Sequence, residues 1–266
     1  MTVRRQLWVV RYTLIVACIA AVVAVARVAN MPVAWLCAVL FLGATRPLQR
    51  RINRVIGQRA FVRLRALLEG ERYAEAHAHL ADLRRVYAHS ASALELLRVH
   101  EGSVLGYERR YADAVRLYES IDRRKLSKET LPWLLHNLAM CLARLGDGAR
   151  AVAAARDSIE QSGAAGDRMR WGDDLRACQL GVLGTALVVD GQATEAVAPL
   201  EQALARGGTP RQQAGRSFYL GEALHTLGRE DEARAAWKRA ADACPGDELA
   251  SRAAERLDSP APPYRS

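Results

Sequence analysis

The chain repeats itself near its C-terminus, where two stretches superimpose when one is moved by 37 residues. Five positions of the first stretch meet the same or a similar residue type in the second. Gly184, Gly191, Ala196, Leu200 and Ala203 match Gly221, Gly228, Ala233, Trp237 and Ala240. A repeat of about 20–50 residues constrains the fold strongly, because each unit must bury its apolar face against its neighbours. We therefore predict a stacked solenoid, whose extended surface is of a kind that proteins use for binding.

The spacing within each stretch predicts a pair of antiparallel helices. The two glycines are seven residues apart, and the next three positions follow at steps of five, four and three. Steps of three, four and seven return to the same face of a helix. The second glycine is placed where the first helix ends and the chain turns. The first glycine lies inside that helix, where it costs about 1 kcal/mol relative to alanine, so we expect it to allow close approach of the partner helix.

This pattern resembles the tetratricopeptide repeat, a helix–turn–helix unit of about 34 residues. The resemblance is strongest over residues 183–205 and 220–247, and it continues in residues 138–159. Two upstream stretches, residues 64–83 and 102–121, keep less of the pattern. In the second repeat unit, Glu101 stands where the pattern expects an apolar residue, so a register shifted by one residue stays open.

The resemblance implies an all-α fold, a right-handed α-solenoid of about five helix hairpins over residues 58–257. The gaps between equivalent alanines of the second helices are 38, 37, 45 and 37 residues, and the longest gap holds an insert around residues 162–174. A generic alanine-rich helical bundle is the alternative fold. The alanines that mark the five units are Ala76, Ala114, Ala151, Ala196 and Ala233.

The end of the chain predicts a cap for this stack. Residues 247–257 have the pattern of a helix whose Leu249, Ala253 and Leu257 face inward and whose outer face is polar. Residues 258–266 are rich in proline and are expected to form a disordered tail.

The net charge of +9 belongs to the N-terminal part of the chain. Residues 1–68 contain eleven arginines, no lysine and no acidic residue, which leaves 27 basic and 29 acidic residues from position 69 onward. The chain from position 69 onward therefore carries a net charge of −2, so the repeat region is nearly neutral, which argues against a nucleic-acid-binding domain. On this ground we expect no nucleic-acid partner.

Two apolar segments predict a membrane hairpin over residues 1–45. Residues 7–26 satisfy the length of about 20 residues that a spanning helix needs, provided that Arg11 extends toward the near headgroups. Residues 28–44 form a shorter second segment after a turn. Arginines flank both outer ends of the hairpin and only Arg27 lies between the segments, so we predict that the N-terminus and the repeats are both cytoplasmic.

Residues 46–57 form a basic juxtamembrane segment, whose Arg46, Arg50, Arg51 and Arg54 are expected to contact anionic lipid headgroups. Two alternatives stay open for the apolar region. The arginine pair at positions 4 and 5, followed by an apolar core, is similar to a secretory signal that would direct export. A helical hairpin buried inside a soluble protein is the second alternative.

The sequence contains no recognisable motif for catalysis or for a cofactor. It has no GxxxxGK[ST] phosphate loop, no HExxH zinc motif and no GxSxG nucleophile turn, and its five cysteines include no CxxC pair. His77 and His79 are two residues apart on a predicted helix, and we interpret them as surface histidines. We therefore expect no catalytic residue, metal, cofactor or small-molecule substrate, and we predict that the protein is not an enzyme.

The resemblance implies that the first helices line a concave face that binds a partner. The mixture of apolar, aromatic and charged side chains on this face suits an extended or helical peptide. Some members of the family hold a peptide's C-terminal carboxylate with Lys, Asn and Arg, and the matching positions here lack that set. Carried over position by position, the face comprises His136, Met140, Arg144, Gly181, Thr185, Val188, Phe218, Glu222 and His225.

These features predict a membrane-anchored, non-catalytic adaptor that binds a protein or peptide partner through a cytoplasmic repeat domain. The alternative is a structural or regulatory subunit of a membrane protein complex, in which the arginine-rich hairpin contacts other membrane spans. An enzyme whose active site lacks a known motif is a third hypothesis, and a buried cluster of titratable groups would support it.

Overall fold

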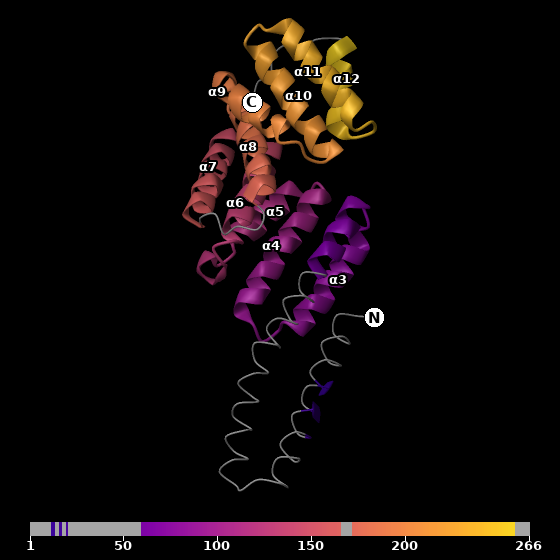
Figure 1. Cartoon of the computed structure of the whole chain (residues 1–266), viewed down its shortest axis with the longest axis vertical. Coiled ribbons are helices and arrows are strands. Elements are labelled where there is room, and N and C mark those ends of the chain that lie inside the picture. The colour runs from indigo at the N-terminus through magenta and orange to yellow at the C-terminus, as the bar shows by residue number, and fades with distance from the viewer. Residues whose placement is uncertain (1–11, 14–15, 18–19, 21–59, 166–171, 259–266) are drawn as a thin grey trace. The chain divides into compact units, whose positions relative to one another are not determined.

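Helices alternate in pairs along the described part of the chain. The computed structural model describes residues 12–13, 16–17, 20, 60–165 and 172–258. No strand occurs among these residues, which confirms the all-α class for them (Figure 1). After a helical stretch at residues 60–69, the elements are α3 (Tyr73–Val86), α4 (Ala91–Tyr107), α5 (Tyr111–Glu119), the short 3₁₀ helix η1 (Arg123–Lys125), α6 (Leu131–Arg144), α7 (Gly148–Ala165), α8 (Gly172–Val189), α9 (Ala193–Ala205), α10 (Pro210–Thr226), α11 (Glu230–Ala243) and α12 (Glu248–Asp258).

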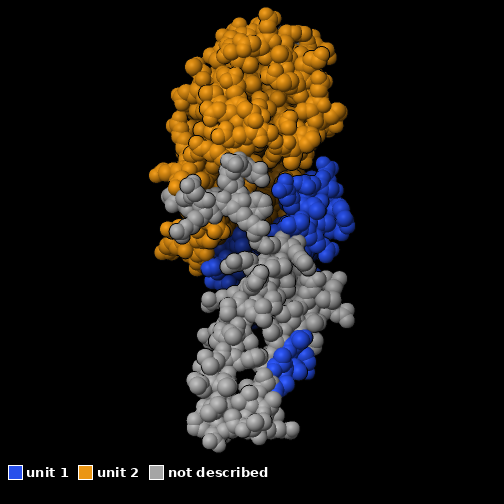
Figure 2. Space-filling view, viewed as in Figure 1, with its two compact units in different colours: residues 1–97 blue, residues 98–266 orange. Residues whose placement is uncertain are grey.

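The chain divides into two compact units, residues 1–97 and 98–266 (Figure 2). The division falls inside α4. In the first unit, residues 60–69 and α3 bury leucines and alanines that recur at steps of three and four. This pattern leaves one apolar stripe on each helix. The buried residues of these two helices are Ala60, Leu64, Leu67, Leu68, Ala76, Leu80 and Leu83.

His79 belongs to this buried stripe, so its interpretation as a surface histidine was wrong. Only 8% of the residue is exposed, and its Nε2 lies 3.0 Å from the carbonyl oxygen of Ala60. The position explains the burial, because His79 is three residues after Ala76 and four before Leu83, on the core face of α3. A single hydrogen bond to a backbone carbonyl satisfies the buried ring nitrogen.

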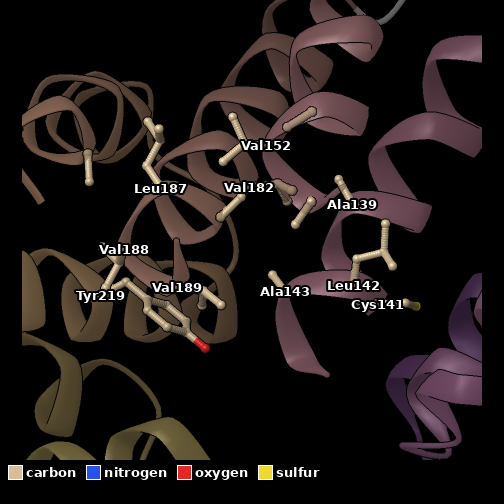
Figure 3. Packing of buried hydrophobic residues seen from close by; sticks show 14 of the residues in the cluster. Ala139, Cys141, Leu142, Ala143, Val152, Val182, Leu187, Val188, Val189 and Tyr219 are labelled. Carbon is tan, nitrogen blue, oxygen red and sulfur yellow. The ribbon is translucent and has the colours of Figure 1, made fainter. Parts of the chain in front are cut away.

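In the second unit, each new first helix packs against both helices of the preceding pair. α8 contacts α7 and α6, α10 contacts α9 and α8, and α12 contacts α11 and α10. This is the nearest-neighbour stacking expected of a repeat protein. α12 therefore takes the place of the first helix of a further pair. One apolar cluster runs through the stack, and Figure 3 shows residues of α6, α7, α8 and α10 within it.

The alanines that mark the repeat are all fully buried, at positions 76, 114, 151, 196 and 233. Glycines inside the first helices allow close approach, as predicted. A Cβ added at Gly184 would overlap the side chain of Leu200, and one added at Gly221 would overlap Trp237. Gly102 has the same relation to Tyr118, sixteen residues later in each case. The register of the second helix pair is therefore not shifted at Glu101.

Replacing Gly221 with alanine is expected to lower the free energy of unfolding by about 1–3 kcal/mol, because the added methyl group overfills the core at Trp237. The matched control is Gly163→Ala in α7, where an added Cβ meets no atom within 4 Å. There, alanine should raise the stability by up to about 1 kcal/mol through its helix propensity. Urea unfolding followed by circular dichroism measures both variants, and effects of the same sign would contradict the packing argument.

The turn inside each helix pair holds one residue in the left-handed region of backbone conformation. Gly146, Gly191 and Gly228 have φ values of 82°, 76° and 74° there. The two upstream pairs use Glu71 and Arg109 at the same position, with φ values of 55° and 61°. A residue with a Cβ is strained in this conformation by roughly 1–2 kcal/mol. The resemblance to the repeat therefore fades toward the N-terminus although the local turn is kept.

The longest gap in the repeat is taken up partly by longer helices. α7 and α8 each have 18 residues, whereas α6 and α11 each have 14. Residues 166–171, between α7 and α8, lie outside the described residues. α12 lies at the position of the predicted cap, and there Leu249 and Ala253 are buried and Leu257 is partly buried against the core.

The predictions for the two ends of the chain fall almost entirely on residues that are not described. These are the membrane hairpin at 1–45, of which only residues 12–13, 16–17 and 20 are described as helical, the basic segment at 46–57 and the tail, of which only residue 258 is described. Within the described part of the chain, no helix has both the length and the apolar content that crossing a membrane requires.

Candidate functional site

Three of the predicted binding residues lie on one stripe of α6. His136, Met140 and Arg144 follow each other at steps of four, which places them on the same side of the helix. α6 has Pro132 in its first turn, where the missing backbone N–H is not needed, and it ends at Arg144, two residues before Gly146. We call these three residues the α6 stripe.

Met140 is the open position of the α6 stripe, with 36% of the residue exposed. Its neighbours Ala139 and Cys141 are buried in the core. Burial raises the pKa of the Cys141 thiol to about 12, so this cysteine is a packing residue rather than a nucleophile. An exposed thioether beside a closed core is a flexible apolar contact of the kind found at protein-binding surfaces.

Arg144 ends the α6 stripe as a charged group in a largely protein environment. Its guanidinium carbon lies 6.0 Å from the centroid of the Tyr111 ring. Burial lowers the pKa of Arg144, but Tyr219 and Tyr111, together with the carboxylates of Glu248 and Asp247, raise it above its ordinary value. The side chain is therefore positively charged at all physiological pH values.

His136 starts the α6 stripe as a neutral ring. Burial and, to a smaller extent, the positive charge of Arg216 lower the pKa of His136 to about 4. The Trp133 ring meets it edge-on at a centroid distance of 5.7 Å. Within the described part of the chain, the Nδ1 atom of His136 is buried without a hydrogen-bond partner, which costs about 1–3 kcal/mol.

Arg216 is a buried cation that the sequence pattern did not single out. Only 6% of the residue is exposed, and its Nη1 donates to the carbonyl oxygens of Ala203, at 3.0 Å, and of Gly207. It thereby caps the C-terminal end of α9, where the helix dipole favours a positive charge. Gly181 makes room for it, since an added Cβ would lie 2.8 Å from Arg216 Nε. Gly181 is therefore a packing position.

The remaining predicted binding residues are less accessible than the α6 stripe. Thr185 and Val188 are buried in α8, and Phe218 and Glu222 are fully buried in α10. His225 has its Nδ1 2.6 Å from Oε1 of Glu230 and only 12% of its side chain exposed. Binding of a partner by these residues stays a prediction, and it would require movement of the elements that cover them.

α12 is the element that covers the face of α10. The guanidinium carbon of Arg252 lies 4.8 Å from the centroid of the Phe218 ring. Arg256 donates from Nε to Glu222 Oε1 at 2.9 Å and from Nη2 to Oε2 at 2.6 Å. Glu222 is 0% exposed, so this bidentate pair is what makes its buried carboxylate tolerable.

The turn before α12 is held by two further ion pairs. Glu248 Oε2 lies 3.1 Å from Nη1 of Arg109, and Asp247 Oδ2 lies 2.8 Å from Nε of Arg211. The same two acids help to raise the pKa of Arg144. The start of α12 therefore lies near both the α6 stripe and the turn after α4.

Arg46, Arg50, Arg51 and Arg54, predicted to contact lipid headgroups, lie outside the described residues. Within the described part of the chain, no group of three or more His, Cys, Asp or Glu side chains is placed to hold a metal ion.

Residues 182–248 match the family described as tetratricopeptide repeat. This segment runs from α8 to the first residue of α12, and the match confirms the resemblance for the best-kept repeats. Two solved structures are similar. YrrB, titled a TPR protein with an unusual peptide-binding site, is 17% identical, with 72% of this chain and 88% of that chain covered and a TM-score of 0.45. The apo form of the quorum sensor NprR from B. thuringiensis is 14% identical, with 85% and 80% covered and a TM-score of 0.39. No curated protein matches this chain.

Proposed function

We propose that this protein is a membrane-anchored, non-catalytic adaptor that binds a protein or peptide partner at the α6 stripe. The family match over residues 182–248 supports a protein-binding repeat scaffold. The observation that carries the choice of site is the exposed Met140, which stands next to the charged Arg144 on a first helix.

The composition of the α6 stripe suits the centre of a protein interface. Arginine and methionine are enriched at such interfaces, and arginine is frequent among the residues that dominate binding energy. Arg144 is already held against Tyr111, so little side-chain entropy remains to be lost when a partner binds. The unpartnered Nδ1 of His136 offers one further polar contact if a partner or a side-chain movement uncovers it.

Membrane anchoring is supported by the sequence. Two apolar segments at residues 7–26 and 28–44 are followed by an acid-free segment with four arginines at 46–54. Confinement to a membrane raises the effective concentration of partners in the same membrane. A modest affinity at the α6 stripe would therefore be enough for function.

Photo-crosslinking in native membranes tests the site. A photoreactive residue in place of Met140 is expected to give a discrete protein adduct. The same residue in place of Asp157, exposed on α7, should not. Adding Arg144→Glu should reduce the adduct yield by about tenfold, the equivalent of 1.4 kcal/mol.

Two outcomes would contradict the proposal. Equal adduct yields from positions 140 and 157 would show that the α6 stripe is not the binding site. Release of the protein from the membrane pellet by alkaline extraction would show that the protein has no membrane anchor, since integral segments resist this extraction.

A further inference from the structure

We propose that Phe218 and Glu222 form a recognition site for an arginine-bearing helix, and that α12 occupies this site as an internal ligand. The two residues are called the α10 site below. The partner class is an amphipathic helix with two arginines four residues apart and a leucine three residues before the first. The inference goes beyond the proposed function, because it assigns a second binding site, on α10 rather than α6, and names the chemistry of a partner that would compete with α12.

The carboxylate of Glu222 selects for arginine. It is fully buried on a first helix, at a position that the repeat pattern places on the binding face. Both of its oxygens accept hydrogen bonds from one guanidinium, at 2.9 and 2.6 Å. The planar fork of arginine matches a carboxylate in this way, and a lysine ammonium cannot do so.

Phe218 supplies the second contact. Its ring is fully buried, and the guanidinium carbon of Arg252 lies 4.8 Å from the ring centroid, within the range of a cation–π interaction. Arg252 and Arg256 are one helical turn apart, so the α10 site contacts two arginines on one face of a helix. Leu249 precedes them by three residues and is buried. The leucine and the two arginines together define the motif Leu-x-x-Arg-x-x-x-Arg.

α12 is held by these polar contacts together with a small apolar face. Its buried residues are one leucine and two alanines, Leu249, Ala250 and Ala253, and Leu257 is partly buried against the core. The Arg109–Glu248 pair is largely in solvent, with side chains 59% and 36% exposed, so salt screens it. Because α12 contacts mainly α11 and α10, the helices of the preceding pair, this terminal helix can open without unstacking the rest. A helix of the same chemistry can therefore take its place.

A peptide of residues 248–258 (ELASRAAERLD), labelled with a fluorophore, is the probe for this site. The protein is the full chain in detergent micelles, either wild type or carrying Arg252→Ala and Arg256→Ala to release its own helix. The peptide is expected to bind the released variant about tenfold or more tightly than wild type, because the tethered α12 competes at high effective concentration. Glu222→Gln, added to the released variant, should weaken peptide binding by about tenfold.

The controls make each outcome decisive. A peptide with both arginines replaced by alanine should not bind, and equal binding of this peptide would overturn the inference. Unchanged peptide binding after Glu222→Gln would also overturn the inference. The same holds if the peptide does not bind a variant in which amide exchange shows that α12 is released and α11 is protected.

A second measurement covers the case in which the released variant does not fold. Excess peptide, added to the wild-type chain, should accelerate amide exchange in α12 alone, and no acceleration would overturn the inference. Crosslinking at Met140 is independent of these results. A failed crosslink with a positive peptide result would reject the α6 stripe and keep the α10 site.

Discussion

Arg256→Ala is expected to free α12 from the stack while α10 and α11 stay folded. The substitution leaves Glu222 with a fully buried carboxylate and no cation, which costs about 3–5 kcal/mol. Against this cost, α12 buries one leucine and two alanines and partly buries Leu257, and a fully buried leucine contributes only about 1.5–3 kcal/mol. The cheapest response is detachment of the helix, which returns Glu222 to water.

Amide hydrogen exchange measures this release. We expect exchange in α12 to accelerate by about 100-fold or more, the equivalent of about 2.7 kcal/mol. The amides of α11, around the fully buried Trp237, should keep their protection. Uniform loss of protection through α10, α11 and α12 would show that α12 is a cooperative part of the stack.

Two further variants separate charge from geometry. Arg256→Lys keeps the positive charge but loses the bidentate fork, so its effect should be intermediate. Arg229→Ala removes an ion pair with Glu232 whose side chains are 43% and 57% exposed. Exposed ion pairs contribute little to stability, so this variant should leave α12 exchange unchanged. A similar effect of both alanine variants would contradict the role of burial.

The repeat predicted the packing inside each helix pair well, because that packing depends on residues at fixed spacing. The alanines at positions 196 and 233 and the contact of Gly221 with Trp237 follow from steps along one helix face. The same spacing still held where the residue type changed, as with Tyr118 against Gly102. Helix periodicity fixes which side of a helix is buried, and the pattern records it directly.

The repeat pattern could not predict which residues of the predicted binding face are exposed to solvent. Glu222 and Met140 are in equivalent first-helix positions of their units, yet one is fully buried and the other is 36% exposed. The difference comes from α12, whose Arg256 reaches Glu222 from 34 residues away in the sequence. Such a pairing depends on the stacking of whole helices, and no local spacing signals it. Burial of Arg216 against Gly181 escaped prediction for the same reason.

Trp237→Ala is expected to lower the free energy of unfolding of the second unit by about 3–5 kcal/mol. Trp237 is fully buried, and its immediate repeat neighbours are Gly221, Ala233, Ala236 and Ala240. None of these has a side chain that can move into the space. The His225 ring and the Arg256 guanidinium also lie near the indole, at 5.4 and 5.9 Å from its centroid, but they are held by Glu230 and Glu222. We therefore expect much of the cavity to stay open, which gives a loss in the range for aromatic-to-alanine substitutions. Urea unfolding followed by circular dichroism measures it.

Trp237→Leu is the matched control, because Leu200 holds the equivalent position in the preceding helix pair against Gly184. Leucine fills part of the indole space, and the substitution also removes the Trp237 Nε1–H, which is buried without a partner in the described part of the chain. We therefore expect this variant to lose less than half as much stability as Trp237→Ala. Equal losses would mean that the indole shape, rather than filled volume, holds α10 to α11. The Trp237 and Arg256 variants are therefore expected to destabilise different parts of the protein. A cavity between paired helices weakens the whole stack, whereas the unpaired charge under the last helix is relieved when that helix alone opens.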